Sequence, residues 1–429
     1  MKAVKKQILE AAVGLMMLLL LIGIAKWSVE VSKKETILTL GIFTGSNWDT
    51  TNGTLYQVID KAIARFEKEH KGVRVEYESG VGEEDYSEWL AGKILLGEEP
   101  DVYMVLSDDF NTLAADGALM KLDSLAKTDP SFHKKNYYPA AYAGGEYNGS
   151  SYALPFECIP TLMFVNKTLL KQEDIEVPDS NWTWGDFHQI CKKVTKDTNG
   201  DDQIDQFGAY NYTWKDAAYS NGAVLFNEEG TKSYVNNDPM ENAVNFVYEL
   251  NDINNGYQVT AADFEGGNVA FCPMLFFDYK NYKSYPWDSQ KYANFEWGCT
   301  TMPAGPKGDN YSELDTLLLG VDERTTEKEL SWELLKALAY DERTQSEIFQ
   351  YSQGVSPLKQ ITESQQEGVD NSLLSIVMEK AMVVPKFRAY SEGISMMDLG
   401  IKEALKSDNN IHTSLILLQK KIDNYLNDR

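Results

Sequence analysis

The sequence predicts an α/β protein in which parallel sheets are flanked by helices. Strand-like and helix-like segments alternate from residue 36 onward, the pattern of a parallel sheet with crossover helices. The 429 residues, 43% of them apolar, are enough for two or three domains with buried cores. The second half continues this alternation without a sequence repeat or a glycine–serine linker. We therefore expect two α/β bodies joined by short connections.

The first half supplies three strands and their helices. Residues 37–43, ILTLGIF, predict a buried strand, and the stripe of apolar residues from Leu55 to Phe66 predicts a helix that stops at Gly72. Residues 73–77 alternate as a second strand. A helical segment to Leu96 then precedes DVYMVL, residues 101–106, as the third strand.

Helices of the second half begin at capping signals, where a side chain accepts hydrogen bonds from the first turn. These signals are Thr183 with Asp186, Asp238 before Pro239, and Thr326 with Glu329. Residues 395–426 also follow a helical pattern.

The four cysteines, Cys158, Cys191, Cys272 and Cys299, can form two disulfides in three connectivities. They are far apart in sequence and have apolar neighbours. This pattern favours buried free thiols.

The charge balance argues against nucleic acid as a partner. The chain carries 65 acidic and 40 basic residues, for a formal net charge of -25. Binding a phosphate backbone requires a basic surface that displaces counterions. We interpret the acidity as a solvated exterior.

Residues 1–35 predict an export signal or a membrane anchor. Lys2, Lys5 and Lys6 precede an apolar run over 11–25, which is short for a spanning helix, so cleavage and anchoring both stay open. No cysteine follows this run, which excludes the usual lipid attachment there. In both cases we expect the body to be extracytoplasmic, at the outer face of the cytoplasmic membrane, anchored or secreted.

Five segments, taken in order, resemble the extracellular solute-binding proteins of carbohydrate ABC importers, the maltose-binding-protein-like family. They are residues 100–123, 147–170, 177–208, 264–279 and 329–359. The resemblance implies a two-lobed periplasmic-binding-protein-like fold with a cleft and a hinge between the lobes. The expected first lobe is 36–155 plus about 300–360, and the second is about 156–299 plus 361–429.

The function that the resemblance implies is capture of a sugar or oligosaccharide by lobe closure and its delivery to the permease subunits of an ABC transporter. Closure requires only that the ligand contacts both lobes and so shifts the equilibrium between open and closed forms. We expect a monomer that needs no cofactor.

Candidate ligand-binding residues follow from the chemistry of sugars, whose ring faces pack on aromatic rings and whose hydroxyl groups pair with carboxylates. In the first lobe they follow the predicted parallel strands, where open α/β sheets place ligands: Trp48, Asp49, Glu78, Asp108 and Asp109. Asp108 aligns with an acidic ligand-contacting position of the family, but Val105 replaces the aromatic residue usual nearby.

The second lobe contributes one acid and several aromatic candidates. Glu157 follows the hinge strand, and Trp214 and Tyr219 follow an aspartate-rich loop. The resemblance adds the positions where the family keeps stacking aromatics: Phe277, Tyr279 and Tyr390.

The aspartate-rich loop, DTNGDDQIDQFG at 197–208, resembles a calcium-binding loop. The matching ligand positions 1, 3, 5, 7 and 9 are Asp197, Asn199, Asp201, Gln203 and Asp205. Asp202 stands where such loops have glycine, and Gly208 stands where they have a bidentate glutamate. Two interpretations stay open: a weak structural calcium site, or an Asn-Gly turn between a helix and a strand.

Other classes of function fit less well. Two carboxylates beside a sugar would suit a glycosidase, but the sequence has no nucleophile elbow, no phosphate-binding glycine loop and no HExxH motif. We therefore predict that the protein is not an enzyme. The alternative to import is a membrane-tethered ligand sensor, or a binder of another polar solute such as a peptide or polyol.

Overall fold

The computed structural model describes residues 16–17, 35–44, 55–78, 80–227, 229–278, 295–352, 354–364, 371–382, 384, 387–406 and 410–428. Apart from Met16, Met17 and Glu35, the predicted export segment lies outside these residues. Within the described ranges, no helix has the length and apolar character needed to cross a membrane.

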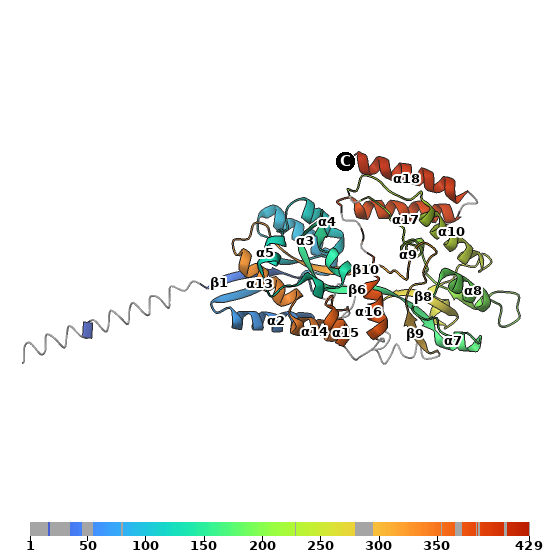
Figure 1. Cartoon of the computed structure of the whole chain (residues 1–429), viewed down its shortest axis with the longest axis horizontal. Helices are drawn as coiled ribbons and strands as arrows, with labels where there is room; N and C mark the ends of the chain where they lie inside the picture. Colours follow the sequence, from blue (N-terminus) through green and yellow to red (C-terminus); the bar gives the residue numbers. More distant parts are fainter. Residues whose placement is uncertain are drawn as a thin grey trace, which may run out of the picture.

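One sheet runs through both lobes, in the order β2-β1-β3-β10-β6-β8-β7, with β9 also paired to β6 (Figure 1). Its strands are β1 (Thr36–Gly41), β2 (Val73–Glu78), β3 (Val102–Val105), β6 (Ala153–Asn166), β7 (Phe207–Ala209), β8 (Val269–Leu275), β9 (Trp297–Thr300) and β10 (Leu314–Val321). The predicted parallel strands β1, β2 and β3 are confirmed. The sheet is nevertheless mixed, because β10 is antiparallel to both β3 and β6.

Helices cover the sheet in each lobe (Figure 1). The first lobe holds α2 (Leu55–Glu69), α3 (Glu83–Leu96), α4 (Ser107–Ala115), α5 (Asp123–Thr128), α6 (Pro139–Ala143), α13 (Lys328–Ala339), α14 (Glu342–Tyr351), α15 (Lys359–Ser364) and α16 (Asn371–Glu379), with the short hairpin of β4 (Glu146–Tyr147) and β5 (Ser150–Ser151). The second holds α7 (Lys167–Gln172), α8 (Trp184–Val194), α9 (Trp214–Ser220), α10 (Asp238–Asp252), α11 (Ala261–Glu265), α17 (Tyr390–Lys406) and α18 (Ile411–Asn427).

Two of the predicted helix starts need correction. The capping box of Thr183 with Asp186 is confirmed at α8. In α10, however, Asn237 is the cap, since its side chain accepts the N–H of Met240 at 2.9 Å and Asp238 is already helical. The box expected at Thr326 does not form, because α13 begins at Lys328 after a residue without a side-chain cap bond.

Strand β6 connects the lobes. All of its 14 residues are buried, and Ala153 to Pro160 pair with β10 of the first lobe while Thr161 to Val165 pair with β8 of the second. The chain returns to the first lobe just before β10 and enters the second again after Met382. The last two crossings lie side by side, because Met382 N–H donates to the carbonyl of Ser312 at 2.9 Å.

The hydrophobic packing favours later lobe boundaries than those expected. α15 and α16 bury Ile361 and Leu374 in the same cluster as the first-lobe sheet, whereas α17 and α18 belong to the cluster around α8, α9 and α10. Gly305 N–H donates to Ser220 of α9 at 2.9 Å, which joins the segment after β9 to the second lobe. We propose boundaries near residues 312 and 382. The described cysteines are free thiols.

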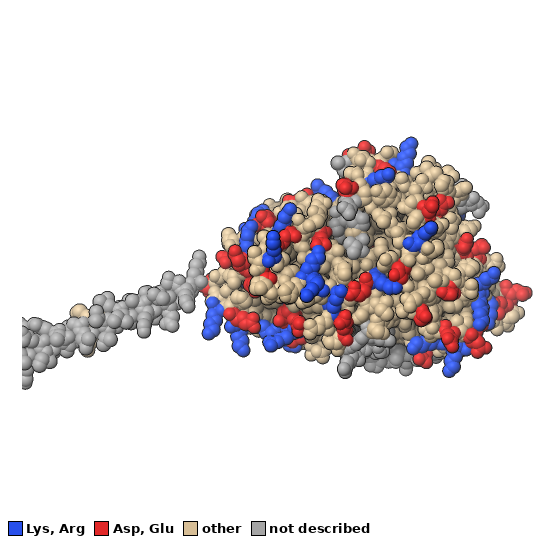
Figure 2. Space-filling view, in the orientation of Figure 1, with Lys and Arg blue, Asp and Glu red and all other residues tan. Residues whose placement is uncertain are grey.

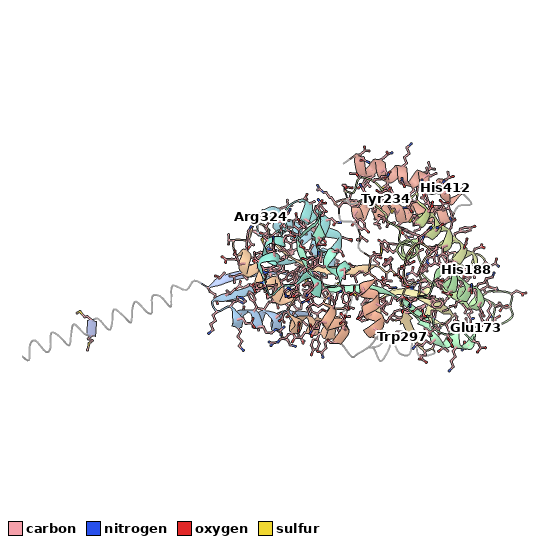
Figure 3. The ribbon with its side chains drawn as sticks, in the orientation of Figure 1. Glu173, His188, Tyr234, Trp297, Arg324 and His412 are labelled. Atoms are coloured by element: carbon pink, nitrogen blue, oxygen red, sulfur yellow. The ribbon has the colours of Figure 1, made fainter. Side chains whose placement is uncertain are left out.

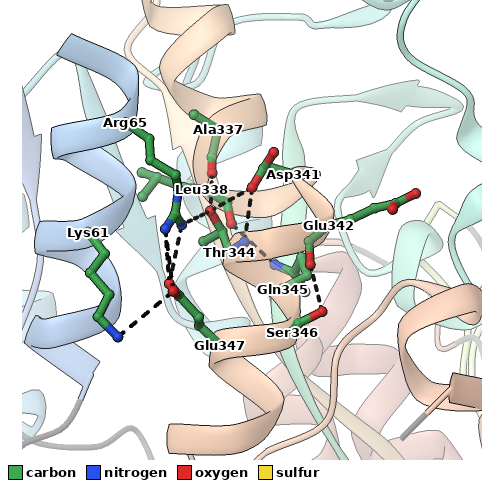
Figure 4. A network of polar contacts seen from close by, with 10 residues as sticks. All are labelled: Lys61, Arg65, Ala337, Leu338, Asp341, Glu342, Thr344, Gln345, Ser346 and Glu347. Carbon is green, nitrogen blue, oxygen red and sulfur yellow. Dashed lines mark hydrogen bonds and ion pairs between the residues drawn. The ribbon is translucent and has the colours of Figure 1, made fainter. Parts of the chain in front are cut away.

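An ion-pair network fixes α14 against α2 (Figure 4). The Arg65 guanidinium lies 3.2 Å from the Glu347 carboxylate and donates to the Thr344 hydroxyl at 2.9 Å. Lys61 approaches the same carboxylate at 3.8 Å. Because the charged side chains of Lys61, Arg65 and Glu347 are partly exposed, their ion pairs orient the helix more than they raise the free energy of unfolding.

A buried carboxyl pair closes the end of the first lobe farther from the second lobe. Glu99 precedes β3 and Asp322 follows β10, and both side chains are 4% exposed. Arg324, labelled in Figure 3, forms an ion pair with Glu99 and donates to the Ile94 carbonyl at 3.0 Å. Among the described residues, Glu99 Oε2 and Asp322 Oδ1 have no hydrogen-bond partner. Burial, followed by the charge of Glu99, raises the pKa of Asp322 to about 7.

We expect stability to fall as the pH rises from about 4 to 7, because folded Asp322 binds a proton there that the unfolded chain releases. Thermal unfolding across this window measures the trend. In Glu99→Gln, the amide can donate to Asp322 and no second carboxylate repels it. The fall in melting temperature between about pH 4 and 7 should therefore be smaller than in the wild type by about 2 °C or more. If the melting temperature of Glu99→Gln falls as steeply with pH as that of the wild type, Glu99 does not raise the pKa of Asp322.

We also expect Gly208→Ala to destabilise the second lobe by about 2 kcal/mol through overpacking. A Cβ at this position would lie 2.4 Å from the Cys191 Cβ of α8. Denaturant unfolding measures the loss. Gly92→Ala is the matched control, since its Cβ would meet nothing within 4 Å in the middle of α3 and should stabilise by about 0.5–1 kcal/mol. Equal effects of the two substitutions would refute the close-packing explanation.

Candidate functional site

The first-lobe acids that the structure describes lie where the parallel strands end. Asp108 and Asp109 form the first turn of α4, directly after β3. Asp108 is exposed, and Asp109 accepts the Ser87 hydroxyl at 2.5 Å. Burial, aided by the neighbouring Asp108, raises the pKa of Asp109. Glu78 ends β2, but its side chain lies outside the described residues, as do Trp48 and Asp49.

Two predicted aromatics meet in the second lobe. Tyr219 of α9 is 3% exposed, and its hydroxyl lies 3.3 Å from the hydroxyl of Tyr390 at the start of α17. Burial raises the pKa of Tyr390 to about 12, and the charges of Glu313 and Asp108 act in the same direction. Because Asp108 belongs to the first lobe, its charge reaches Tyr390 from the other lobe.

Sequence reasoning missed a charged cluster beside these tyrosines. Lys215 of α9 lies 2.7 Å from the carboxylate of Glu313, at the crossing before β10. Asp315 adds to the negative charge around Lys215 and accepts the Ser107 hydroxyl at 2.6 Å. Lys215 and Glu313 are 98 residues apart, so no local pattern pairs them.

Asp216 and Asp278 extend the acidic character of the second-lobe side. Asp216 caps α9 by accepting the N–H of Thr213 at 2.8 Å, and burial raises its pKa to about 6. The Thr213–Asp216 spacing repeats the capping box of α8, which is the signal that could have found it. Burial also raises the pKa of Asp278 to about 6. Burial raises the pKa of the Cys272 thiol, and the charges of Asp278 and Asp216 raise it further.

The remaining candidates make contacts of their own. Glu157 is 1% exposed and accepts the N–H of Gly354 at 2.6 Å and the Ser352 hydroxyl, so it holds that loop against β6. Trp214 donates its indole N–H to Asp398 of α17 at 3.2 Å, in a groove that Tyr219 and Tyr390 do not line. Phe277 is half-buried after β8, and Tyr279 lies outside the described residues.

The lobes also touch through a direct ion pair. Arg388, just before α17, lies 3.6 Å from the carboxylate of Asp116 at the end of α4, and both side chains are more than half exposed. Deeper in the hinge, a water-sized cavity of about 30 Å³ lies between Ser107, Leu314 and Met382. The residues of this region thus span both lobes and the hinge.

The aspartate-rich loop is closed by its own hydrogen bonds. Asp197 accepts the backbone N–H groups of Asn199, Gly200 and Asp202 at 2.7–3.0 Å, which hold its pKa below the usual range. The Asp205 carboxylate accepts the N–H of Thr198 at 2.8 Å. Asp202 itself makes the sharp turn, with φ of 65°. No three Asp, Glu, His or Cys side chains of the described ranges form a metal-ligand group. These contacts are those of an aspartate-rich turn that leads into β7.

Comparisons with known proteins agree with this architecture. The profile of the family described as bacterial extracellular solute-binding protein matches residues 48–343. The fold is similar to the sugar-binding protein MalE of Xanthomonas citri, with a TM-score of 0.77 and 16% identity over 92% of this chain and 98% of that one. It is also similar to a cyclic alpha-maltosyl-1,6-maltose binding protein of Arthrobacter globiformis, with a TM-score of 0.76 and 15% identity over 92% and 100%.

A further solved structure and a curated relative are also similar to this chain. An ABC substrate-binding protein of Listeria monocytogenes in complex with cycloalternan has a TM-score of 0.69 and 18% identity over 92% of this chain and 99% of that one. An uncharacterized lipoprotein of the oleD 5' region of Streptomyces antibioticus is 26% identical over 137 residues, 31% of this chain and 29% of the relative. The match thus spans less than a third of that relative.

We expect removal of the interlobe ion pair to favour the open form slightly. An exposed pair contributes at most about 1 kcal/mol, so Arg388→Ala and Asp116→Ala should each shift the open–closed equilibrium by up to about fivefold. Small-angle scattering or a fluorescent pair across the lobes measures the shift at low salt. The double variant should add nothing to either single variant, and a fully additive effect would show that the two side chains act independently.

Proposed function

Because the chain belongs to the bacterial extracellular solute-binding proteins, whose profile covers residues 48–343, we propose that it captures a sugar or oligosaccharide between its lobes and delivers it to ABC permease subunits. The observation that carries the proposal is the closeness of the two lobes at the start of α17, where Arg388 lies 3.6 Å from Asp116 of the first lobe and the charge of Asp108 acts on Tyr390. A solute held there contacts both lobes at once. Its release to a permease then requires only that the lobes open.

The side chains around this position suit a hydroxylated ligand. Carboxylates such as Asp108 accept hydroxyl hydrogen bonds in charge-assisted form, and the tyrosine hydroxyls of Tyr219 and Tyr390 both donate and accept. The Lys215–Glu313 pair offers one donor and one acceptor group side by side. No group in this arrangement needs to form or break a covalent bond with the solute.

The comparisons support the choice of ligand class. The proteins of similar fold include one described as a sugar-binding protein and one described as a cyclic alpha-maltosyl-1,6-maltose binding protein. The family description also supports an extracellular location, and we propose anchoring or secretion through residues 1–35. The proposal requires no cofactor and no second copy of the chain, and calcium binding by the loop at 197–205 stays a prediction.

The surface fits a soluble capture protein. Acidic and basic side chains are interspersed over the visible face of both lobes (Figure 2). With a net charge of -25, the protein is expected to stay apart from other acidic macromolecules. We propose that it works as a monomer beside its permease.

We expect a sugar from a panel of mono- and oligosaccharides to raise the melting temperature at millimolar concentration, because binding stabilises the folded state. Asp108→Ala should weaken that binding by about 10- to 100-fold, through loss of a hydrogen bond to a charged group. Isothermal titration measures the affinity. Glu342→Ala, an exposed acid in the first turn of α14, is the matched control and should leave the affinity unchanged.

Different failures have different meanings. If a peptide or polyol raises the melting temperature and no sugar does, the ligand class is wrong. If a sugar binds equally well to Asp108→Ala and to the wild type, the placement of the site is wrong. Turnover of a labelled glycan would show that the protein acts as an enzyme.

A further inference from the structure

A groove of about 1350 Å³ lies within the second lobe. Its walls are the segment from Ala209 to Lys215, the end of α10 with the following loop to Ala261, and α17 from Ile394 to Lys406. Every described residue that lines it belongs to the second lobe. The groove is therefore formed whether the lobes are open or closed.

One lining side chain is almost buried and has no partner. Asn254 is 8% exposed, and within the described ranges its side-chain amide makes no hydrogen bond. Its backbone is fixed, because its N–H donates to Asn251 at 3.1 Å and its carbonyl accepts the N–H of Tyr257 at 3.0 Å. An amide held in this way presents a donor and an acceptor to a hydroxylated ligand.

Two tyrosine rings of the groove are held from behind. Tyr257 stacks on Phe207 with ring centroids 4.8 Å apart and an interplanar angle of 15°, yet it is 47% exposed. Tyr210 is half-buried and stacks on Phe264 at 6.3 Å. Rings fixed on one face offer the other face to the apolar hydrogens of a pyranose at little cost in conformational entropy.

The acidic residue of the described groove lining is paired within the groove. Asp398 is the acidic residue among its described lining, and it lies 2.7 Å from Lys402 and accepts the indole N–H of Trp214. Burial opposes ionisation of this carboxyl group, but the bonds from Lys402 and Trp214 prevail and lower its pKa. A groove with its carboxylate neutralised in this way favours a neutral ligand over a cationic one.

We propose that this groove is a second carbohydrate site, which binds a neutral pyranose chain through Asn254, Tyr257 and Tyr210 independently of lobe closure. It differs from the interlobe site, where carboxylates of both lobes surround the solute. Helix α9 contributes to both sites, because Trp214 and Lys215 line the groove and Lys215 also pairs with Glu313. A chain bound in the groove would remain on the protein while the cleft opens and closes.

Titration of the protein, as exported by a bacterial host, with maltotriose, mannotriose and chitotriose tests the proposal. We expect two binding events with at least one of these trisaccharides. Asn254→Leu and Tyr257→Ala should each weaken one event at least tenfold and leave the event that depends on Asp108. Tyr248→Ala is the control for Tyr257→Ala, because Tyr248 is also 47% exposed but does not line the groove.

The outcomes separate this site from the interlobe site. Groove binding that survives in Asp108→Ala supports the second site even if the cleft takes some other solute. The proposal is overturned if no trisaccharide shows an event sensitive to Asn254→Leu and Tyr257→Ala. An unchanged or higher melting temperature of Asn254→Leu would confirm that the variant folds, since leucine removes an unpaired amide of similar size.

Discussion

The structure depends on β6, a single strand that is buried over all 14 of its residues and pairs with different partners in each half. A strand of this kind carries the sheet from one lobe to the other, with one register shift opposite Leu317 and Leu318 of β10. It restricts relative motion of the lobes to bending at the three crossings, because any larger separation would leave ladder groups unpaired. Lobe closure is thus a hinge motion about a fixed sheet.

The same constraint brings acidic groups together at the cleft. The start of α4 after β3 and the start of β10 lie together, since Ser107 donates to Asp315 at 2.6 Å, and the charges of Asp108 and Glu313 both act on Tyr390 of α17. Burial without enough cations raises the pKa values of Asp109, Asp216 and Asp278. A solute that donates hydrogen bonds relieves this cost, and water in an open cleft does so less completely, which favours closure around the solute.

Local sequence patterns predicted many elements of the fold but few contacts of the candidate site. The apolar stripe of α2 and the capping box at Thr183 are local signals, and the structure confirms both. The box expected at Thr326 failed because its pattern matches by residue type, while the backbone there turns into the helix two residues later. Lys215 and Glu313 meet only because α9 packs beside a crossing 98 residues away, and no local pattern records such a contact.

Helix α9 contributes side chains to both the cleft and the groove. Its capping box fixes the first turn, which holds Trp214 and the adjacent Lys215, and both residues line the groove. Lys215 balances part of the acidity of the cleft, whereas Trp214 joins Asp398 in a neutralised pair within the groove. A backbone shift in this turn would disturb both contacts, although the described residues that line the groove all belong to the second lobe.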